Sequence, residues 1–185
     1  AGTLSITAPS SIPAGVFTVT VTVTDRFSLS SNTLTVGNYV VVYDASAGFV
    51  TGGGWITANS GSCVTAYAPA GVCTNATGGR ANFGFVSKYQ NGAKTPTGNT
   101  EFQFQAGNLN FKSTVYDWLV VSGPMAQYKG HGTINGGTTS YQFILTAVDG
   151  SLPGSGGSDE FRIKIMDESG HVVFDNQLGA ADSDM

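Results

Sequence analysis

The chain has 185 residues, of which only 11% are charged, and 8 basic against 12 acidic residues give a formal net charge of −4. Hydrophobic residues make up 41% and aromatic residues 11%, enough to bury a core, so the composition excludes intrinsic disorder. It also argues against nucleic acid as a partner, because such binding depends on clustered lysine and arginine. The longest apolar run, Tyr39 to Tyr43, is far shorter than the roughly 20 residues of a membrane span.

Alternation of apolar and polar residues with period two dominates the chain. Val16 to Asp25 alternates valine with threonine, as a strand does when one face packs and the other meets solvent. Further segments of this kind are Thr33 to Asp44, Phe49 to Thr57, Ala81 to Gln90, Glu101 to Ala106, Leu109 to Ser113, Trp118 to Ser122, Ala126 to Ile134, Tyr141 to Val148, Asp159 to Asp167 and Val172 to Asn176. We predict an all-β fold, specifically a β-sandwich of the jelly-roll or immunoglobulin-like type with about eleven short antiparallel strands.

The large apolar residues at alternating positions are expected to form the core of the sandwich. They are Phe49, Trp55, Phe83, Phe85, Phe102, Phe104, Phe111, Trp118, Phe143, Leu145, Phe161, Ile163 and Ile165. Trp55 follows three glycines, whereas Trp118 lies in an apolar run. Of the two tryptophans, Trp55 is therefore the better candidate for an exposed ring that binds a ligand such as a sugar.

Cys63 and Cys73 lie ten positions apart in a stretch rich in small residues. This spacing favours a small disulfide loop over a metal or redox site, with two free thiols as the alternative. Closing the loop would constrain the unfolded chain by about 2–3 kcal/mol. A disulfide and a sparsely charged surface point to an extracellular or cell-surface location.

The first motifs resemble a known module. Val16 to Asp25, followed by Tyr39 to Asp44, is similar to the closing strands of a PKD domain, an immunoglobulin-like module of secreted prokaryotic proteins. An immunoglobulin-like sandwich takes about seven strands, and the first 44 residues hold at most three. Residues 1–44 are therefore expected to be terminal strands of a PKD-like or Ig-like module, or strands added to the next domain.

Residues 45–185 are expected to form the β-sandwich domain. The segments Gly48 to Ile56, Arg80 to Tyr89, Pro96 to Phe104 and Tyr116 to Val121 occur in an order that resembles the C-terminal β domain following PKD or choice-of-anchor domains in secreted prokaryotic proteins. The resemblance implies a structural or adhesive accessory and supplies no catalytic residues. The Cys63–Cys73 loop departs from the family pattern.

A second departure concerns assembly. The family continues past its acidic tail into a glycine-rich apolar strand, which does not follow Met185 here. We expect an open sheet edge that pairs with a neighbouring copy by strand addition, so that the protein would be a subunit of an extracellular filament. Trimming of the chain is the alternative explanation. A carbohydrate-binding module, with or without calcium, is the alternative function, with polysaccharide as the partner.

Acidic residues gather towards the end of the chain, where eight of the twelve lie from Asp149 onward. Asp149 and Asp159 bracket one loop and are the best candidate ligands for Ca²⁺, which prefers carboxylate and carbonyl oxygens. No EF-hand pattern occurs, and solvated turn carboxylates are the alternative. For Asp175, a hairpin turn at Ser169-Gly170 would place Lys164 opposite, so that a cross-strand ion pair explains the carboxylate.

No sequence pattern indicates catalysis. His131 and His171 are the only histidines, and neither a G-x-S-x-G nor an H-E-x-x-H motif occurs. Glu101, Asp117 and Asp149 are conceivable as paired carboxylates for glycoside hydrolysis, but their spacing does not favour it. We expect a non-enzymatic protein with no cofactor other than Ca²⁺.

Overall fold

The computed structural model describes residues 12–24, 26–27, 30, 34–43, 48–74, 77–90 and 93–182. The predicted domain boundary between residues 44 and 45 lies outside these ranges. Helix is confined there to two short 3-10 turns, η1 (Thr65–Tyr67) and η2 (Gln105–Gly107). No described helix has the length and apolar character needed to cross a membrane.

The described chain is all-β, which confirms the predicted class. Two strands form a hairpin of their own, and eight form a second sheet. The hairpin strands are β1 (Gly15–Val21) and β2 (Leu34–Val42). The sheet strands are β3 (Phe49–Ala58), β4 (Gly79–Lys88), β5 (Thr97–Phe104), β6 (Leu109–Ser122), β7 (Met125–Ile134), β8 (Tyr141–Val148), β9 (Glu160–Met166) and β10 (Val172–Asp175).

The predicted count of eleven strands is not confirmed, because two expected segments are halves of one strand. Leu109 to Ser113 and Trp118 to Ser122 both belong to β6, whose pairing with β7 shifts register near Ser113 and again near Tyr116. A bulge adds an unpaired residue and breaks the alternation of a strand. The interruption in the sequence pattern thus marks an irregular strand instead of a turn.

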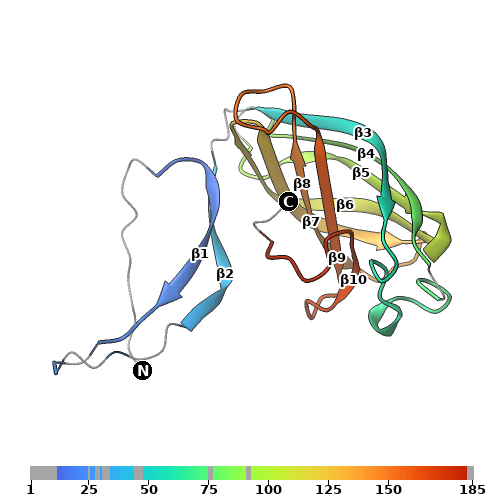
Figure 1. Ribbon diagram of the computed structural model, residues 1–185, viewed down its shortest axis with the longest axis horizontal. Coiled ribbons are helices and arrows are strands. Elements are labelled where there is room, and N and C mark those ends of the chain that lie inside the picture. Colours follow the sequence, from blue (N-terminus) through green and yellow to red (C-terminus); the bar gives the residue numbers. More distant parts are fainter. Residues whose placement is uncertain are drawn as a thin grey trace.

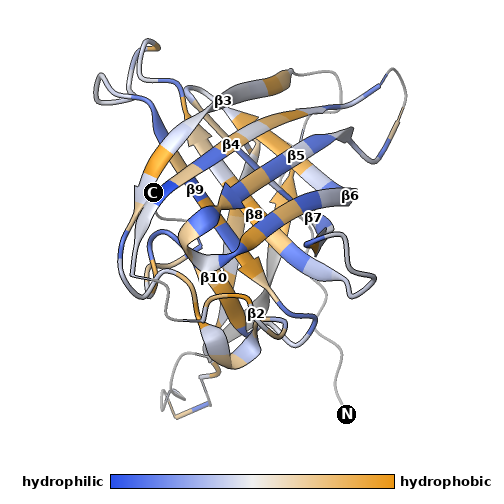
Figure 2. Cartoon of the chain, turned by 90° about the vertical axis from the view of Figure 1, so that its right-hand side faces the viewer, coloured by the Kyte–Doolittle hydropathy of each residue, from blue (hydrophilic) through white to orange (hydrophobic). Residues whose placement is uncertain are grey.

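The eight strands form a single antiparallel meander in the order β10-β9-β8-β7-β6-β5-β4-β3 (Figure 1). The sheet curls so that β3–β5 cross over β8 and β9, which lie behind them in Figure 2. The two separate facing sheets of the predicted sandwich are therefore not confirmed. Alternation specifies which side chains face inward, but it does not specify whether the inward faces belong to two sheets or to one curled sheet.

One end of the curled sheet is closed by the segment that follows β3. The Val64 amide donates to the Val173 carbonyl at 2.8 Å, and the Asp175 amide donates to the Ser62 carbonyl at 2.9 Å. The predicted disulfide between Cys63 and Cys73 is confirmed, with its Cα atoms 5.2 Å apart. It closes a loop within this segment, and the backbone bonds of Val64 and Asp175 join the segment to β10.

Aromatic rings fill the interior. Phe83 on β4 stacks on Phe161 of β9 with centroids 3.7 Å apart, and Phe102 on β5 contacts Phe174 of β10 at 4.7 Å. These pairs join strands that are far apart in the sheet order. The opposite walls of the curled sheet are therefore held together mainly by ring contacts, which contribute beyond their area of burial.

Three predicted core residues lie outside the core: Phe49 is 64% exposed, Trp55 is 57% exposed, and Trp118 is partly exposed and does not belong to the core cluster. In β3 the even-numbered positions face inward, and two of them are Gly52 and Gly54. A Cβ at Gly52 would lie 2.6 Å from the ring of Phe85. Glycine thus lets β3 pass close over the interior rings, and the large side chains of β3 point outward.

A hydroxyl network lies inside the aromatic core. The Thr100 hydroxyl contacts the Tyr116 hydroxyl at 2.8 Å and the Tyr128 hydroxyl at 2.9 Å, and Ser113 contacts Tyr116 at 3.0 Å. Burial raises the pKa of Tyr116 and raises that of Tyr128 well above its ordinary value. Each polar atom of this network has a partner, as buried hydroxyls require.

The C-terminal segment is fastened by a buried arginine. The predicted register is confirmed, since Lys164 lies opposite Asp175. The predicted ion pair between them is not formed, because the Arg162 side chain donates to both Asp175 carboxylate oxygens at 3.2 and 3.0 Å. Arg162 also donates to the carbonyls of Ala180 and Ala181, while Lys164 pairs with Asp182 at 2.7 Å.

Asp175→Asn should reduce the free energy of unfolding by about 3–5 kcal/mol, because it leaves the Arg162 charge buried without its carboxylate. Side-chain exposure in this pair is 3% and 1%. Glu101→Gln is the matched control: the Glu101–Lys112 pair is exposed, so the loss should be below about 1 kcal/mol. Urea unfolding measures both changes, and equal effects would contradict the assignment.

Stability should fall as the pH rises above about 10, where free tyrosine ionises. Tyr128 and Tyr116 stay protonated in the folded protein at that pH because their pKa values are raised, so unfolding releases protons. Tyr128→Phe should flatten this fall by at most about 1.4 kcal/mol per pH unit. Urea unfolding at successive pH values measures the slope for each protein.

Candidate functional site

The edge of β3 lies beside a groove of about 570 Å³. Within the described residues, the backbone of β3 pairs with β4 on one side and with nothing on the other. The facing wall comes from β9 and from the loops that join β6 to β7 and β8 to β9. Its lining includes Val121, Ala147, Leu152 and Phe161. The groove is thus an open seam in the curled sheet, and we call it the seam groove.

The seam groove reaches the aromatic core. Its lining includes Phe83 and Phe161, the two rings that stack across the sheet, and both are only partly buried. The seam remains open because β10 is short: its pairing with β9 ends at Lys164, and Asn176 then donates to the Phe161 carbonyl in place of a strand. Apolar lining and an unpaired backbone edge therefore occur together here.

The predicted metal ligands lie at one end of the seam groove, and both serve as turn carboxylates. Asp159 accepts from the Gly150 amide at 2.8 Å, and Asp149 accepts from the Ser151 hydroxyl at 2.6 Å. The Ser151 hydroxyl bond also lowers the pKa of Asp149. In the described part of the chain, no three histidine, cysteine or acidic side chains gather as a metal site would require. Calcium binding by this pair remains a prediction.

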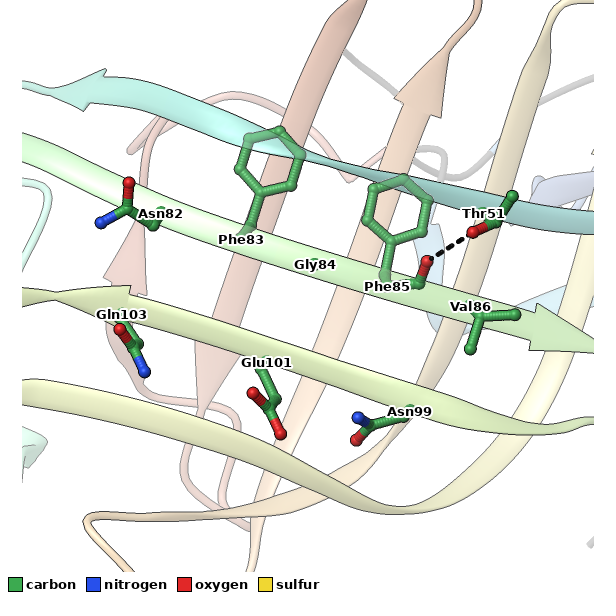
Figure 3. Close-up of a pocket in the computed structure, with 9 residues that line it drawn as sticks. All are labelled: Thr51, Asn82, Phe83, Gly84, Phe85, Val86, Asn99, Glu101 and Gln103. Carbon is green, nitrogen blue, oxygen red and sulfur yellow. Dashed lines mark hydrogen bonds between the residues drawn. The ribbon is translucent and has the colours of Figure 1, made fainter.

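A second hollow, of about 430 Å³, lies on the outer face of β4 and β5. Asn99, Glu101 and Gln103 follow one another along β5, and Gly84 lies between Phe83 and Phe85 on β4 (Figure 3). We call this hollow the outer trough. Hydrophilic residues are prominent along β5 in Figure 2 and alternate with Phe102 and Phe104, which are fully buried on the inner face.

Trp55, the predicted ligand-binding residue, lines the seam groove and lies next to the outer trough. Its cross-strand partner is Asn82, which lines the trough, and Arg80 lies over the indole ring at 4.8 Å. The Arg80 guanidinium also donates to the Asn82 side-chain oxygen at 3.1 Å. Sequence reasoning found the exposed tryptophan but missed the trough. The adjoining glycines of β3 and Gly84 of β4 were the signal for it.

The histidines and candidate catalytic carboxylates are distributed over several local pairs. His131 lies 3.5 Å from Asp117 and 3.2 Å from Glu168, and His171 lies 2.9 Å from Asp167. The His171 bond lowers the pKa of Asp167, and a hydrogen bond from Ser140 lowers that of Glu168. Glu101 and Asp149, by contrast, have partners on strand β6 and in their own turn. The structure does not bring Glu101, Asp117 and Asp149 into one described interaction.

Comparison of the chain with protein-family models, with curated proteins and with solved structures found no match in any of the three. The resemblance to the C-terminal β domain that follows PKD domains therefore remains a prediction from the motifs alone.

The calcium prediction has a definite outcome. If Asp149 and Asp159 share an ion, millimolar CaCl₂ should raise the melting temperature and EDTA should reverse the rise. Asp159→Asn should abolish the shift in melting temperature. Asp117→Asn, on β6 and outside this loop, should retain it. A melting temperature that CaCl₂ leaves unchanged would contradict calcium binding at this loop.

Proposed function

We propose that this protein is a non-enzymatic structural or adhesive module of a secreted or cell-surface prokaryotic protein, and that copies of it assemble by adding a strand to the seam groove. The observation that carries the proposal is the edge of β3, which pairs with no strand among the described residues and lies beside partly exposed core rings. Extracellular location is supported by the Cys63–Cys73 disulfide, since disulfides persist in oxidising compartments.

An added strand would satisfy two requirements at once. Its backbone would pair with the free N–H and C=O groups of β3, which otherwise offer a template for uncontrolled pairing. Its apolar side chains would cover Phe83 and Phe161, whose rings line the groove. Main-chain hydrogen bonds would supply affinity and side-chain pockets would supply specificity, as in other strand-addition complexes.

The β1–β2 hairpin of a neighbouring copy is the proposed donor. It stands to one side of the curled sheet (Figure 1), and Tyr43, directly after β2, stacks on Tyr89 at 5.2 Å. A lone two-stranded hairpin is marginally stable, and this one exposes Phe17 and Val40. Because donor and acceptor surfaces differ, the contact would repeat head to tail and build a filament.

Within this proposal the chain divides as the motifs predict. Residues 1–44 supply terminal strands of a PKD-like module, and residues 45–185 supply the acceptor domain. The two facing walls of the curled sheet then act as the two layers of a β-sandwich, packed through their aromatic rings. The resemblance of the motifs to secreted accessory domains supports the division, and so does the separation of the described strands into two sheets.

A pair of blocked variants tests the assembly. Leu152→Asp places a charge in the seam groove, and Val19→Pro removes a backbone donor from β1. Each variant alone should be monomeric by light scattering, whereas the unaltered chain should form larger species as its concentration rises. Mixing the two variants should give a one-to-one dimer and nothing larger, because one retains the donor and the other the acceptor.

Leu178→Asp is the matched control, because Leu178 is 53% exposed and Leu152 is 45% exposed, but Leu178 does not line the groove. This variant should assemble as the unaltered chain does. A monodisperse monomer for the unaltered chain at every concentration would refute the proposal. So would loss of assembly in the Leu178 variant, or the absence of dimers in the mixture. Circular dichroism establishes that each variant is folded.

A further inference from the structure

Two glycines at the outer trough are not explained by the packing of this chain: Gly84 lines the trough, and Gly53 lies beside it on β3, where it also lines the seam groove. Gly53 on β3 and Gly84 on β4 are direct cross-strand partners. A Cβ at Gly84 would meet no atom within 4 Å, and one at Gly53 would meet only ordinary contacts at 3.4 Å and beyond. Gly52 and Gly54 differ, because the rings of Phe85 and Phe83 lie directly beneath them.

Glycine within a strand weakens the strand and commonly marks a place where a ligand or another backbone approaches closely. Neither Gly53 nor Gly84 has a positive φ that would demand glycine. Two adjacent glycines on an outward face therefore indicate that a ligand or another backbone lies against the sheet at this position.

Side chains that both donate and accept hydrogen bonds lie around Gly84 in the trough. Asn82 lies beside Gln103, and Val86 lies beside Asn99, with Glu101 between them opposite Gly84. Within the described chain, the side-chain amides of Asn99 and Gln103 have no hydrogen-bond partner. Residues two apart on a strand are separated by about 7 Å, so Asn99, Glu101 and Gln103 form a linear array about 13 Å long.

The charges near the trough are already matched. Glu101 pairs with Lys112 at 3.2 Å, and Arg80 lies over Trp55 while donating to Asn82. The remaining donors and acceptors are neutral amides, each with one acceptor oxygen and two N–H donors. This complement suits neighbouring hydroxyl groups, which both donate and accept, and it offers no net charge to an ionic ligand. Trp55 adds a flat apolar ring at the border.

We propose that the outer trough binds a linear neutral polysaccharide, laid over Gly53 and Gly84, with its hydroxyls on the amides of β4 and β5 and one sugar ring against Trp55. A chain polymer matches a linear array of amides, and an exposed aromatic ring matches the apolar face of a sugar. The amides and Gly84 lie in the outer trough, whereas Gly53 and Trp55 also line the seam groove, so the two proposed surfaces share part of β3. Sugar binding does not itself require strand addition.

Isothermal titration tests the proposal with cellohexaose, xylohexaose, mannohexaose and maltohexaose as probes and hexagalacturonate as the charged comparison. The protein is the full chain carrying Leu152→Asp, so that self-association does not interfere. At least one neutral probe should bind, and hexagalacturonate should bind more weakly. Gln103→Ala should weaken binding about tenfold, the loss expected for a hydrogen bond and its desolvated partner.

Gly84→Val is the decisive variant, because it adds a side chain to the trough at a position where a Cβ would meet no protein atom within 4 Å. It should abolish binding while the melting temperature stays the same or rises, since valine favours strands. Tyr67→Ala, at an exposed ring away from the trough, should bind as the unaltered chain does.

Three results would overturn the proposal: no binding of any neutral probe, stronger binding of hexagalacturonate, or full binding by the Gly84 variant. A lower melting temperature for Gly84→Val would also count against the proposal, because the glycine would then serve the curvature of the sheet.

Discussion

The rest of this structure depends on the contact between aromatic rings from opposite walls of one curled sheet. Phe83 and Phe161 stack at 3.7 Å although their strands, β4 and β9, lie far apart in the sheet order. The curl brings such rings together and leaves little room for a separate second sheet. The interior is then completed by the Thr100 hydroxyl network, in which every polar group has a partner.

Closing the sheet at one end leaves the other end open. Around the disulfide, the segment after β3 pairs with β10, and the Arg162–Asp175 pair fastens the tail against β9. Farther along, β10 has ended, and β3 faces β9 without a strand between them. The seam groove is the geometrical consequence of a short last strand beside a long first one, and it is where assembly is proposed.

Glycine has two different roles within strand β3. At Gly52 and Gly54 it permits close approach to the interior rings, so the protein itself explains these residues. At Gly53, and at its partner Gly84, no neighbouring atom explains it. The inner face of β3 is therefore limited to glycine by the core rings, whereas its outer face is a candidate surface for a ligand. The seam groove and the outer trough consequently meet at one edge strand.

The sequence by itself determined the all-β class, the positions of most strands, the disulfide and the register that sets Lys164 opposite Asp175, because alternation, turn residues and cysteine spacing are local signals. Only the tertiary structure decided that Arg162 forms the ion pair with Asp175, that Phe49 and Trp55 face outward, and that β6 is one bulged strand. It also decided that a single sheet curls to leave a seam. These features depend on curvature and on which strand lies at the edge, and neither is encoded in a pattern of neighbouring residues.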